Sequence, residues 1–96
     1  MLIARVIGSA VSTVKDDKLQ GLKLLVVREV TPDNQPIGKP LVAIDAVGAG
    51  VNEVVLIAQG SSARQTPQTT NKPVDAVIMA IVDSWEIGGV DKYRKD

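Results

Sequence analysis

Apolar and polar residues alternate along this chain in short blocks rather than in long helical stripes. Runs rich in valine, isoleucine and leucine are separated by glycine, proline, aspartate and asparagine. β-Branched residues suit a pleated sheet, and the separating residues favour turns. The pattern therefore predicts an all-β barrel or sandwich. The predicted strands are Leu2–Val14, Leu22–Val30, Leu41–Val47, Glu53–Ala58 and Val74–Ile87.

Details within these blocks refine the prediction. Gly8 lies inside the first predicted strand, where a glycine often marks a bulge or a bend at a barrel corner. Residues 31–40 hold three prolines and a glycine, which predicts an exposed loop. Residues 77–82 would also suit a buried helix by periodicity alone, but their β-branched content favours a strand. Gly88-Gly89 ends the last predicted strand and leaves residues 90–96 as a charged tail.

A polar stretch with a serine near its start separates the fourth and fifth predicted strands. Ser61 can accept a hydrogen bond from a backbone N–H, so residues 61–65 are expected to form one short helical turn. Five strands and this one short helix between strands 4 and 5 predict a small OB-like β-barrel. The length of 96 residues predicts a single domain over residues 1–96.

Composition indicates what kind of core this barrel has. The chain is 45% hydrophobic, yet Trp85 and Tyr93 are its only aromatic residues. The core must therefore consist of valine, isoleucine, leucine and alanine. A small domain with such a core often gains stability by associating with further copies.

Charge and missing residue types narrow the function classes. Eleven basic and eleven acidic residues give zero formal net charge, which argues against nucleic acid as a partner. The absence of cysteine excludes disulfides and thiolate metal sites. No apolar run approaches the roughly 20 residues of a membrane helix, and no signal peptide is expected at the N-terminus.

The first candidate site is a glycine loop before the fourth predicted strand. Two glycines spaced like those of a dinucleotide-binding fingerprint lie here, but the third glycine is missing and a strand follows instead of a helix. A structural loop is therefore favoured over a phosphate cradle. The loop consists of Gly48, Ala49, Gly50, Val51, Asn52 and Glu53.

The second candidate site follows that strand and consists of Gly60, Ser61, Ser62, Ala63 and Arg64. The two serines lack a histidine to act as base, so helix capping is favoured over nucleophilic catalysis. Arg64 can hold a carboxylate, carbonyl or anion in its planar fork, and a solvated surface arginine is the alternative. The carboxylates of Asp45, Glu53, Asp75 and Asp83 favour turn and cap roles. No catalytic residue, cofactor or metal is predicted.

Taken in order, several motifs resemble the CcmL/EutN family of bacterial microcompartment vertex proteins. The resemblance covers nearly the whole chain. Its motifs are Met1-Leu2-Ile3-Ala4-Arg5-Val6-x-Gly8, Gly21-Leu22-Lys23-Leu24-Leu25-Val26-Val27, Asp45-x-Val47-Gly48-Ala49-Gly50, Gly60-Ser61-Ser62-Ala63-Arg64, Pro73-Val74-Asp75-Ala76 and Ile81-Val82-Asp83.

The resemblance implies a structural, non-enzymatic role in the cytoplasm. Such proteins form homopentamers that cap the vertices of a polyhedral shell and contact its hexameric shell proteins. By position, residues 48–53 would lie at the rim facing those hexamers. Residues 60–64 would lie at the axial pore or the subunit interface. Asn52 stands where the family favours glycine, and asparagine also tolerates a positive φ.

Two alternatives remain open from the sequence. One is an OB-like binding module for nucleic acid or oligosaccharide, although Trp85 and Tyr93 are too few and too separated to form its usual aromatic platform. Docking of these two rings against a neighbouring subunit is favoured instead. The other alternative is a ring of six, because a small change at a heterologous interface alters the closure angle. Carboxysome, ethanolamine, propanediol and glycyl-radical compartments are equally compatible with the sequence.

Overall fold

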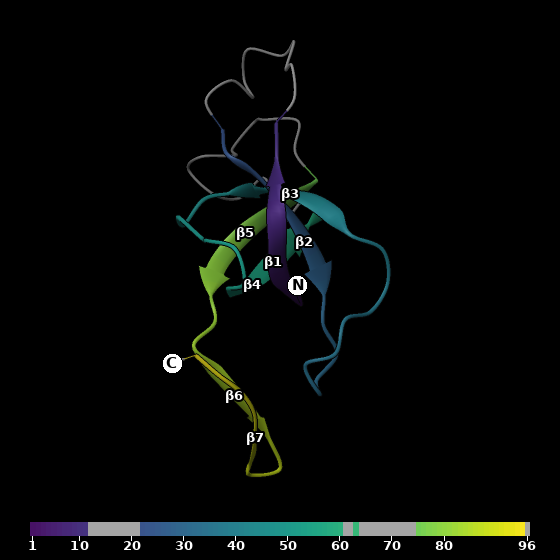
Figure 1. The fold of residues 1–96 in the computed structure, drawn as a ribbon, viewed down its shortest axis with the longest axis vertical. Helices are drawn as coiled ribbons and strands as arrows, with labels where there is room; N and C mark the ends of the chain where they lie inside the picture. The colour runs from purple at the N-terminus through teal and green to yellow at the C-terminus, as the bar shows by residue number, and fades with distance from the viewer. Residues whose placement is uncertain (12–21, 61–62, 64–74, 96) are drawn as a thin grey trace.

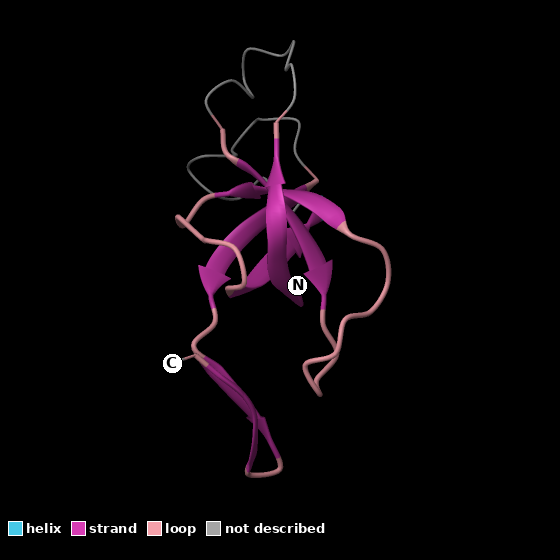
Figure 2. Ribbon diagram, in the orientation of Figure 1, coloured by secondary structure: helices cyan, strands magenta, loops and turns pink. Residues whose placement is uncertain are grey.

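The computed structural model describes residues 1–11, 22–60, 63 and 75–95. Figure 1 shows a barrel with a hairpin extending from one end, and Figure 2 shows that the described elements are all strands. Their bounds are β1 Leu2–Ala10, β2 Leu24–Glu29, β3 Leu41–Asp45, β4 Val54–Gln59, β5 Ala76–Ile81, β6 Ser84–Ile87 and β7 Val90–Arg94. No helix in this part of the chain is long and apolar enough to cross a membrane.

Five of these strands close into a barrel in the order β1-β2-β3-β5-β4, with β4 pairing back onto β1. All neighbours are antiparallel except β3 and β5, which are parallel. The expected OB-like five-stranded barrel is thereby confirmed. The strand interpretation is also confirmed for residues 77–81, which belong to β5, and Val82 follows the end of that strand.

Gly8 lies at a register shift in β1. Val6 pairs with Val27 but Gly8 pairs with Val26, so Ile7 is the extra residue. This bulge confirms the expectation from the glycine, and it leaves Ile7 47% exposed on the outer surface.

The barrel interior is aliphatic, as the composition predicts. Alternate residues of the first two strands point inward, so β1 buries Ala4 and Val6 while β2 buries Leu25 and Val27. Every buried hydrophobic residue of the described chain is alanine, valine, leucine or isoleucine. The main cluster is Ala4, Val6, Leu25, Val27, Ala43, Ala49, Val55, Ile57, Ala76 and Ile78.

The long fifth strand predicted over Val74–Ile87, and the charged tail after it, are wrong. The chain leaves the barrel after Ile81 and forms a separate two-stranded hairpin of β6 and β7. Gly88 and Gly89 both adopt positive φ, 58° and 84°, which is the conformation of a two-residue hairpin turn. The glycine pair is therefore a turn within a hairpin and not the end of the ordered chain.

The short helix expected between strands 4 and 5 is not shown, because it falls almost wholly outside the described residues. Within that stretch the structure describes only Ala63, which is fully buried. It packs with Ile44, Ala58 and Val77 in a second apolar cluster.

Candidate functional site

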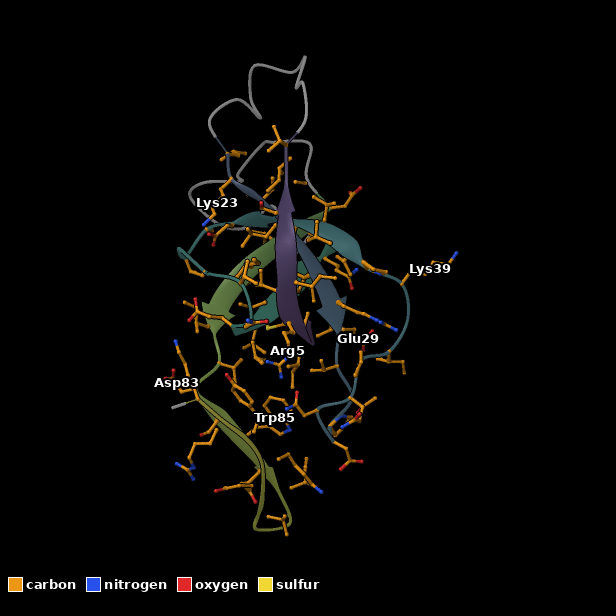
Figure 3. All side chains as sticks on the ribbon, viewed as in Figure 1. Arg5, Lys23, Glu29, Lys39, Asp83 and Trp85 are labelled. Atoms are coloured by element: carbon orange, nitrogen blue, oxygen red, sulfur yellow. The ribbon has the colours of Figure 1, made fainter. Side chains whose placement is uncertain are left out.

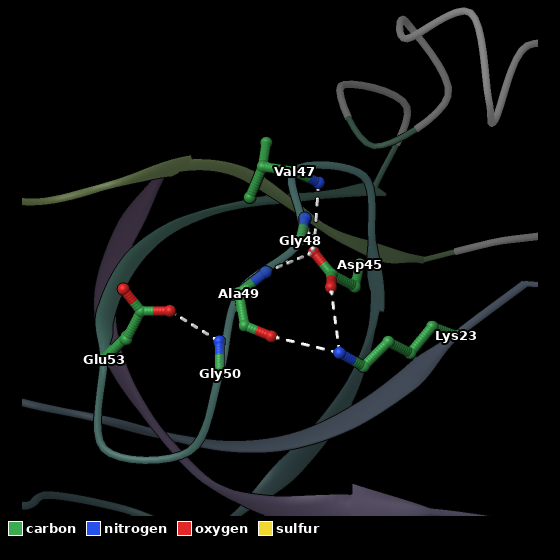
Figure 4. A network of polar contacts seen from close by, with 7 residues as sticks. All are labelled: Lys23, Asp45, Val47, Gly48, Ala49, Gly50 and Glu53. Atoms are coloured by element: carbon green, nitrogen blue, oxygen red, sulfur yellow. Dashed lines mark hydrogen bonds and ion pairs between the residues drawn. The ribbon is translucent and has the colours of Figure 1, made fainter.

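The loop of residues 48–53 is organised by a single carboxylate just before it. Asp45 ends β3, and its Oδ1 accepts hydrogen bonds from the backbone N–H groups of Val47, Gly48 and Ala49 at 3.0, 3.0 and 3.2 Å. The Asp45 side chain is only 2% exposed. One charged acceptor thus satisfies three successive backbone donors, as Figure 4 shows.

Lys23 closes the same loop from the opposite side. Its Nζ lies 3.7 Å from Asp45 Oδ2 and donates to the carbonyl of Ala49 at 3.2 Å. Ala49 is itself 1% exposed and belongs to the barrel core. Ala49 in the middle of the loop is therefore held against the barrel. The residues on either side of it, Val47 and Val51, are exposed.

Glu53 holds the far end of the loop. Its Oε1 accepts from the Gly50 N–H at 2.6 Å, and its Oε2 accepts from Lys95 Nζ at 2.5 Å. The hydrogen bond from Lys95, and after it that from Gly50, lower the pKa of Glu53 below its usual range. The same hydrogen bond to Glu53 raises the pKa of Lys95. Lys95 follows β7, so this contact ties the loop to the base of the hairpin.

Two loop residues need a left-handed backbone. Gly48 has φ 79° and Asn52 has φ 74°. Asparagine adopts this region more readily than most residues, so Asn52 can hold this turn without a glycine. The Asn52 backbone is also fixed to β1, because its N–H donates to Val6 O at 2.8 Å and its carbonyl accepts from Arg5 at 3.0 Å.

The outward flanks of the loop are apolar. Val47 is 38% exposed and Val51 is 57% exposed. Gly50 lies between them in the chain, and a Cβ added there would come 3.3 Å from Glu53 Oε1. Asp45 before the loop and Glu53 at its end are both engaged by backbone amides and by a lysine, so the loop is held at both ends.

The described part of the chain contains no cluster of three or more acidic or metal-ligating side chains. Asp45 and Glu53 each bind backbone amides of the loop itself, so they form no shared acid–base pair. Asp83 is exposed near the base of the hairpin. Figure 3 shows Asp83 at the base of the hairpin and Lys23 toward the opposite end of the barrel.

The second candidate site, residues 60–64, is described only in part. Ser61, Ser62 and Arg64 lie outside the described residues. Gly60 has φ 64°, and its N–H donates to the carbonyl of Asp75 at 2.9 Å. Ala63 is buried within the second apolar cluster.

Trp85 and Tyr93 come together, although eight positions separate them in the chain. Their rings stack with centroids 5.1 Å apart, because the two residues pair across β6 and β7. Trp85 Nε1 donates to the carbonyl of Pro32 at 2.9 Å, and the Arg5 guanidinium lies 5.7 Å from the Tyr93 ring centre. Both rings therefore have partners within the chain. No aromatic side chain lies on the described strands of the barrel itself, where an OB-like strand binder would need one.

Sequence reasoning identified the glycine loop but missed the two lysines that hold it. Lys23 is separated from Ala49 by 26 residues, and Lys95 from Glu53 by 42. A lysine in a sequence carries no sign of its distant partner. The only local signal was Asp45 directly before the loop, a residue type that often accepts from amides two or three positions on.

Comparison with known proteins gives one family. The family described as ethanolamine utilisation protein EutN/carboxysome matches residues 1–83. The carboxysome shell vertex protein CcmL of a Synechocystis strain is 41% identical over 99% of this chain and 95% of its own length. The microcompartment shell vertex protein EutN of Escherichia coli is 44% identical over 99% of this chain and 100% of its own length.

The match extends to solved structures. The structure of GrpN from Rhodospirillum rubrum, described as a pentameric microcompartment shell protein, superposes with a TM-score of 0.83 at 44% identity. The superposition covers 91% of this chain and 99% of GrpN. The resemblance found in the sequence motifs is thereby confirmed over the whole barrel.

Proposed function

This chain belongs to the ethanolamine utilisation protein EutN/carboxysome family, and from that membership we propose that it is a structural vertex protein of a bacterial microcompartment shell. The observation that carries the proposal is the agreement of sequence and barrel with shell vertex proteins along nearly the full length of both partners. Such shells are assemblies within the bacterial cytoplasm.

The functional unit is a ring of five copies. A closed ring needs a heterologous interface, in which one face of a subunit meets a different face of the next. The pentameric GrpN structure supports five as the number of copies. Zero net charge suits close association of identical subunits, because it adds no overall repulsion between them.

Residues 48–53 form the rim contact with hexameric shell proteins. Their suitability rests on rigidity, since Asp45 and Lys23 fix one flank and Lys95 holds Glu53 at the other. The exposed side chain of Val51 offers apolar area to a neighbour. Residues 60–64 face the axial pore or the subunit interface, as the family resemblance implies for that segment.

Co-expression with a hexameric shell protein tests this function. Gly50→Val is expected to leave the pentamer intact but to prevent shell closure, because its branched side chain enters the space beside Glu53 Oε1 and alters the rim. The measurements are native mass for the ring and electron microscopy for the shells.

Val42→Ala is the matched control, since Val42 is 50% exposed on β3 outside the loop. Closed shells of normal yield from Gly50→Val would exclude the loop as the rim contact. A wild-type protein that stays monomeric at micromolar concentration would exclude the vertex function itself.

A further inference from the structure

The hairpin of β6 and β7 is a separate two-stranded sheet that extends from one end of the barrel, as Figure 1 shows. Two strands by themselves are at best marginally stable in water. The residues beside its turn add little, since Ile87 and Val90 are 51% and 57% exposed. Within one subunit, the stability of the hairpin therefore depends on contacts at its base, where Trp85 Nε1 donates to the Pro32 carbonyl at 2.9 Å.

The first contact from this base to the rim loop, residues 48–53, is made by Lys95. Lys95 follows β7 and donates from Nζ to Glu53 Oε2 at 2.5 Å. The other oxygen of the same carboxylate accepts from the Gly50 N–H at 2.6 Å. One carboxylate therefore bridges the hairpin and the backbone of the loop, and its orientation depends on both partners.

The second contact is made by Arg5 on β1. Its Nη1 donates to the Asn52 carbonyl of the loop at 3.0 Å, and its guanidinium carbon lies 5.7 Å from the Tyr93 ring centroid of the hairpin. A cation at this distance from an aromatic face is attracted to it. Tyr93 in turn stacks on Trp85, with ring centroids 5.1 Å apart. Figure 3 shows Arg5 and Trp85 at the end of the barrel from which the hairpin extends.

The two halves of the rim loop depend on the hairpin to different degrees. The N–H of Ala49 is held by Asp45 Oδ1 at 3.2 Å, and Asp45 belongs to β3 of the barrel. The N–H of Gly50 is held by Glu53, whose carboxylate also binds Lys95. Two adjacent amides of one loop therefore have separate supports, one supplied by the barrel and one shared with the hairpin.

We propose that residues 50–53 and the hairpin form one cooperative unit, with Lys95 and Arg5 as the positioning residues that join them. In one state the base of the hairpin is packed and both contacts are made. In the other state the base is released, Glu53 loses Lys95, and residues 50–53 lose the shape that meets a neighbouring shell protein. Occupation of the rim then favours the packed hairpin, because coupling between two sites is reciprocal. The inference rests on the proposed function of the rim loop and names what regulates it.

Amide hydrogen exchange, followed by NMR on the whole chain, tests the coupling from the hairpin side. Trp85→Leu removes the ring stack and the hydrogen bond to Pro32, both of which lie outside the rim loop. Exchange at Gly50 is expected to rise about tenfold, within the range usual for coupled sites, while exchange at Ala49 stays within about threefold. Ile87→Thr is the matched control, because it changes an exposed residue of the same strand, keeps the β-branch and leaves the base intact. It is expected to leave both amides as in wild type.

The reverse direction is tested from the loop side. Glu53→Gln keeps an oxygen that can accept from Gly50 but loses the charge that binds Lys95. Amides of β6 and β7 are expected to exchange about fivefold faster or more.

A pair of variants at Lys95 isolates the contact between ammonium and carboxylate. Lys95→Met keeps an apolar stem but no charge, whereas Lys95→Arg keeps a charged donor. Lys95→Met is expected to speed exchange both at Gly50 and in the hairpin, and Lys95→Arg is expected to stay within about threefold of wild type. In co-expression with a hexameric shell protein, rings of Lys95→Met are expected to close into fewer shells than rings of Lys95→Arg.

The outcomes separate the coupling from the rim function on which it rests. The coupling is overturned if Trp85→Leu or Lys95→Met speeds exchange in the hairpin but leaves exchange at Gly50 unchanged. Equal acceleration at Gly50, at Ala49 and at the Asp45 N–H, which donates to the Lys23 carbonyl, would also overturn it, because the whole chain would then be loosened. Normal shells from Gly50→Val, with exchange at Gly50 still following the hairpin, would overturn the rim function and leave the coupling standing.

Discussion

Replacing Asp45 is the sharpest test of how the rim loop is built. Its Oδ1 is the acceptor for three backbone N–H groups, and its Oδ2 lies 3.7 Å from Lys23. Asp45→Ala removes all of these interactions at once. The backbone amides of residues 47–49 must then find water or remain without a partner.

The expected loss can be worked from the burial of each donor. A hydrogen bond to a charged group contributes about 1.5–3 kcal/mol, but an exposed donor that loses its partner regains water. Val47 and Gly48 are exposed and can be solvated, whereas Ala49 is 1% exposed and cannot. We therefore expect Asp45→Ala to lower the free energy of unfolding by about 3 kcal/mol, close to one full unsatisfied donor plus two weakened ones.

Asp45→Asn removes the negative charge but keeps an oxygen that can accept hydrogen bonds. The amide oxygen can still accept from the loop, but neutral hydrogen bonds are roughly half as strong, so a loss of about 1–1.5 kcal/mol is expected. Urea unfolding at fixed protein concentration measures both values, since association would otherwise shift the apparent stability. A loss of ~3 kcal/mol corresponds to a melting temperature lower by roughly 15 °C in a domain of this size.

Asp33→Asn is the control for Asp45. Asp33 forms an ion pair with Lys92 but its side chain is 72% exposed, so a change within about 0.5 kcal/mol is expected. If Asp45→Ala were as mild as Asp33→Asn, the loop would not depend on this carboxylate, and the reasoning from amide satisfaction would be refuted.

Three further predictions concern residues that hold or shape the same loop. Lys95→Met is expected to raise the pKa of Glu53 toward its ordinary value of 4.5, because the Lys95 hydrogen bond is the first cause of the lowering. Since the folded pKa of Glu53 is lowered and that of Lys95 is raised, the pair stabilises the fold between the acid and alkaline limits. That contribution is lost as the pH falls through the folded pKa of Glu53 or rises through that of Lys95. If NMR showed the same Glu53 titration in Lys95→Met as in the wild type, Lys95 would not be the cause of the lowered pKa. Gly48→Ala is expected to cost about 1 kcal/mol in urea unfolding, because only the positive φ of 79° penalises a side chain where nothing lies within 4 Å. Asn52→Gly is its counterpart and is expected to be neutral within about 0.5 kcal/mol or stabilising, so a clear loss there would show that the Asn52 side chain does more than tolerate its φ.

The hairpin illustrates where sequence reasoning went wrong. Val74–Ile87 is nearly continuously apolar and so predicts one long strand, although the polar residues Asp83 and Ser84 stand just beyond the end of β5 at Ile81. That point is decided by the barrel, since Val82 N–H donates to Val54 O before the chain departs. The Gly88-Gly89 pair was a usable turn signal between two short strands.

The sequence by itself determined the class of fold, the aliphatic core and the bulge at Gly8. These follow from residue type and spacing, because inward positions of a closed barrel repeat every second residue and a glycine tolerates the distorted backbone of a bulge. The ordered motifs also sufficed to identify the family. The prediction that residues 1–96 form a single domain stays a prediction.

Only the tertiary structure decided how the loop is held and where the hairpin goes. The contacts of Lys23 with Ala49 and of Lys95 with Glu53 join residues 26 and 42 positions apart. Which distant side chains meet depends on strand order and register, and neither is written in local composition. The same holds for Arg5 opposite Arg28 and Glu86 opposite Asp91, because a slip of one residue in either ladder would separate each pair.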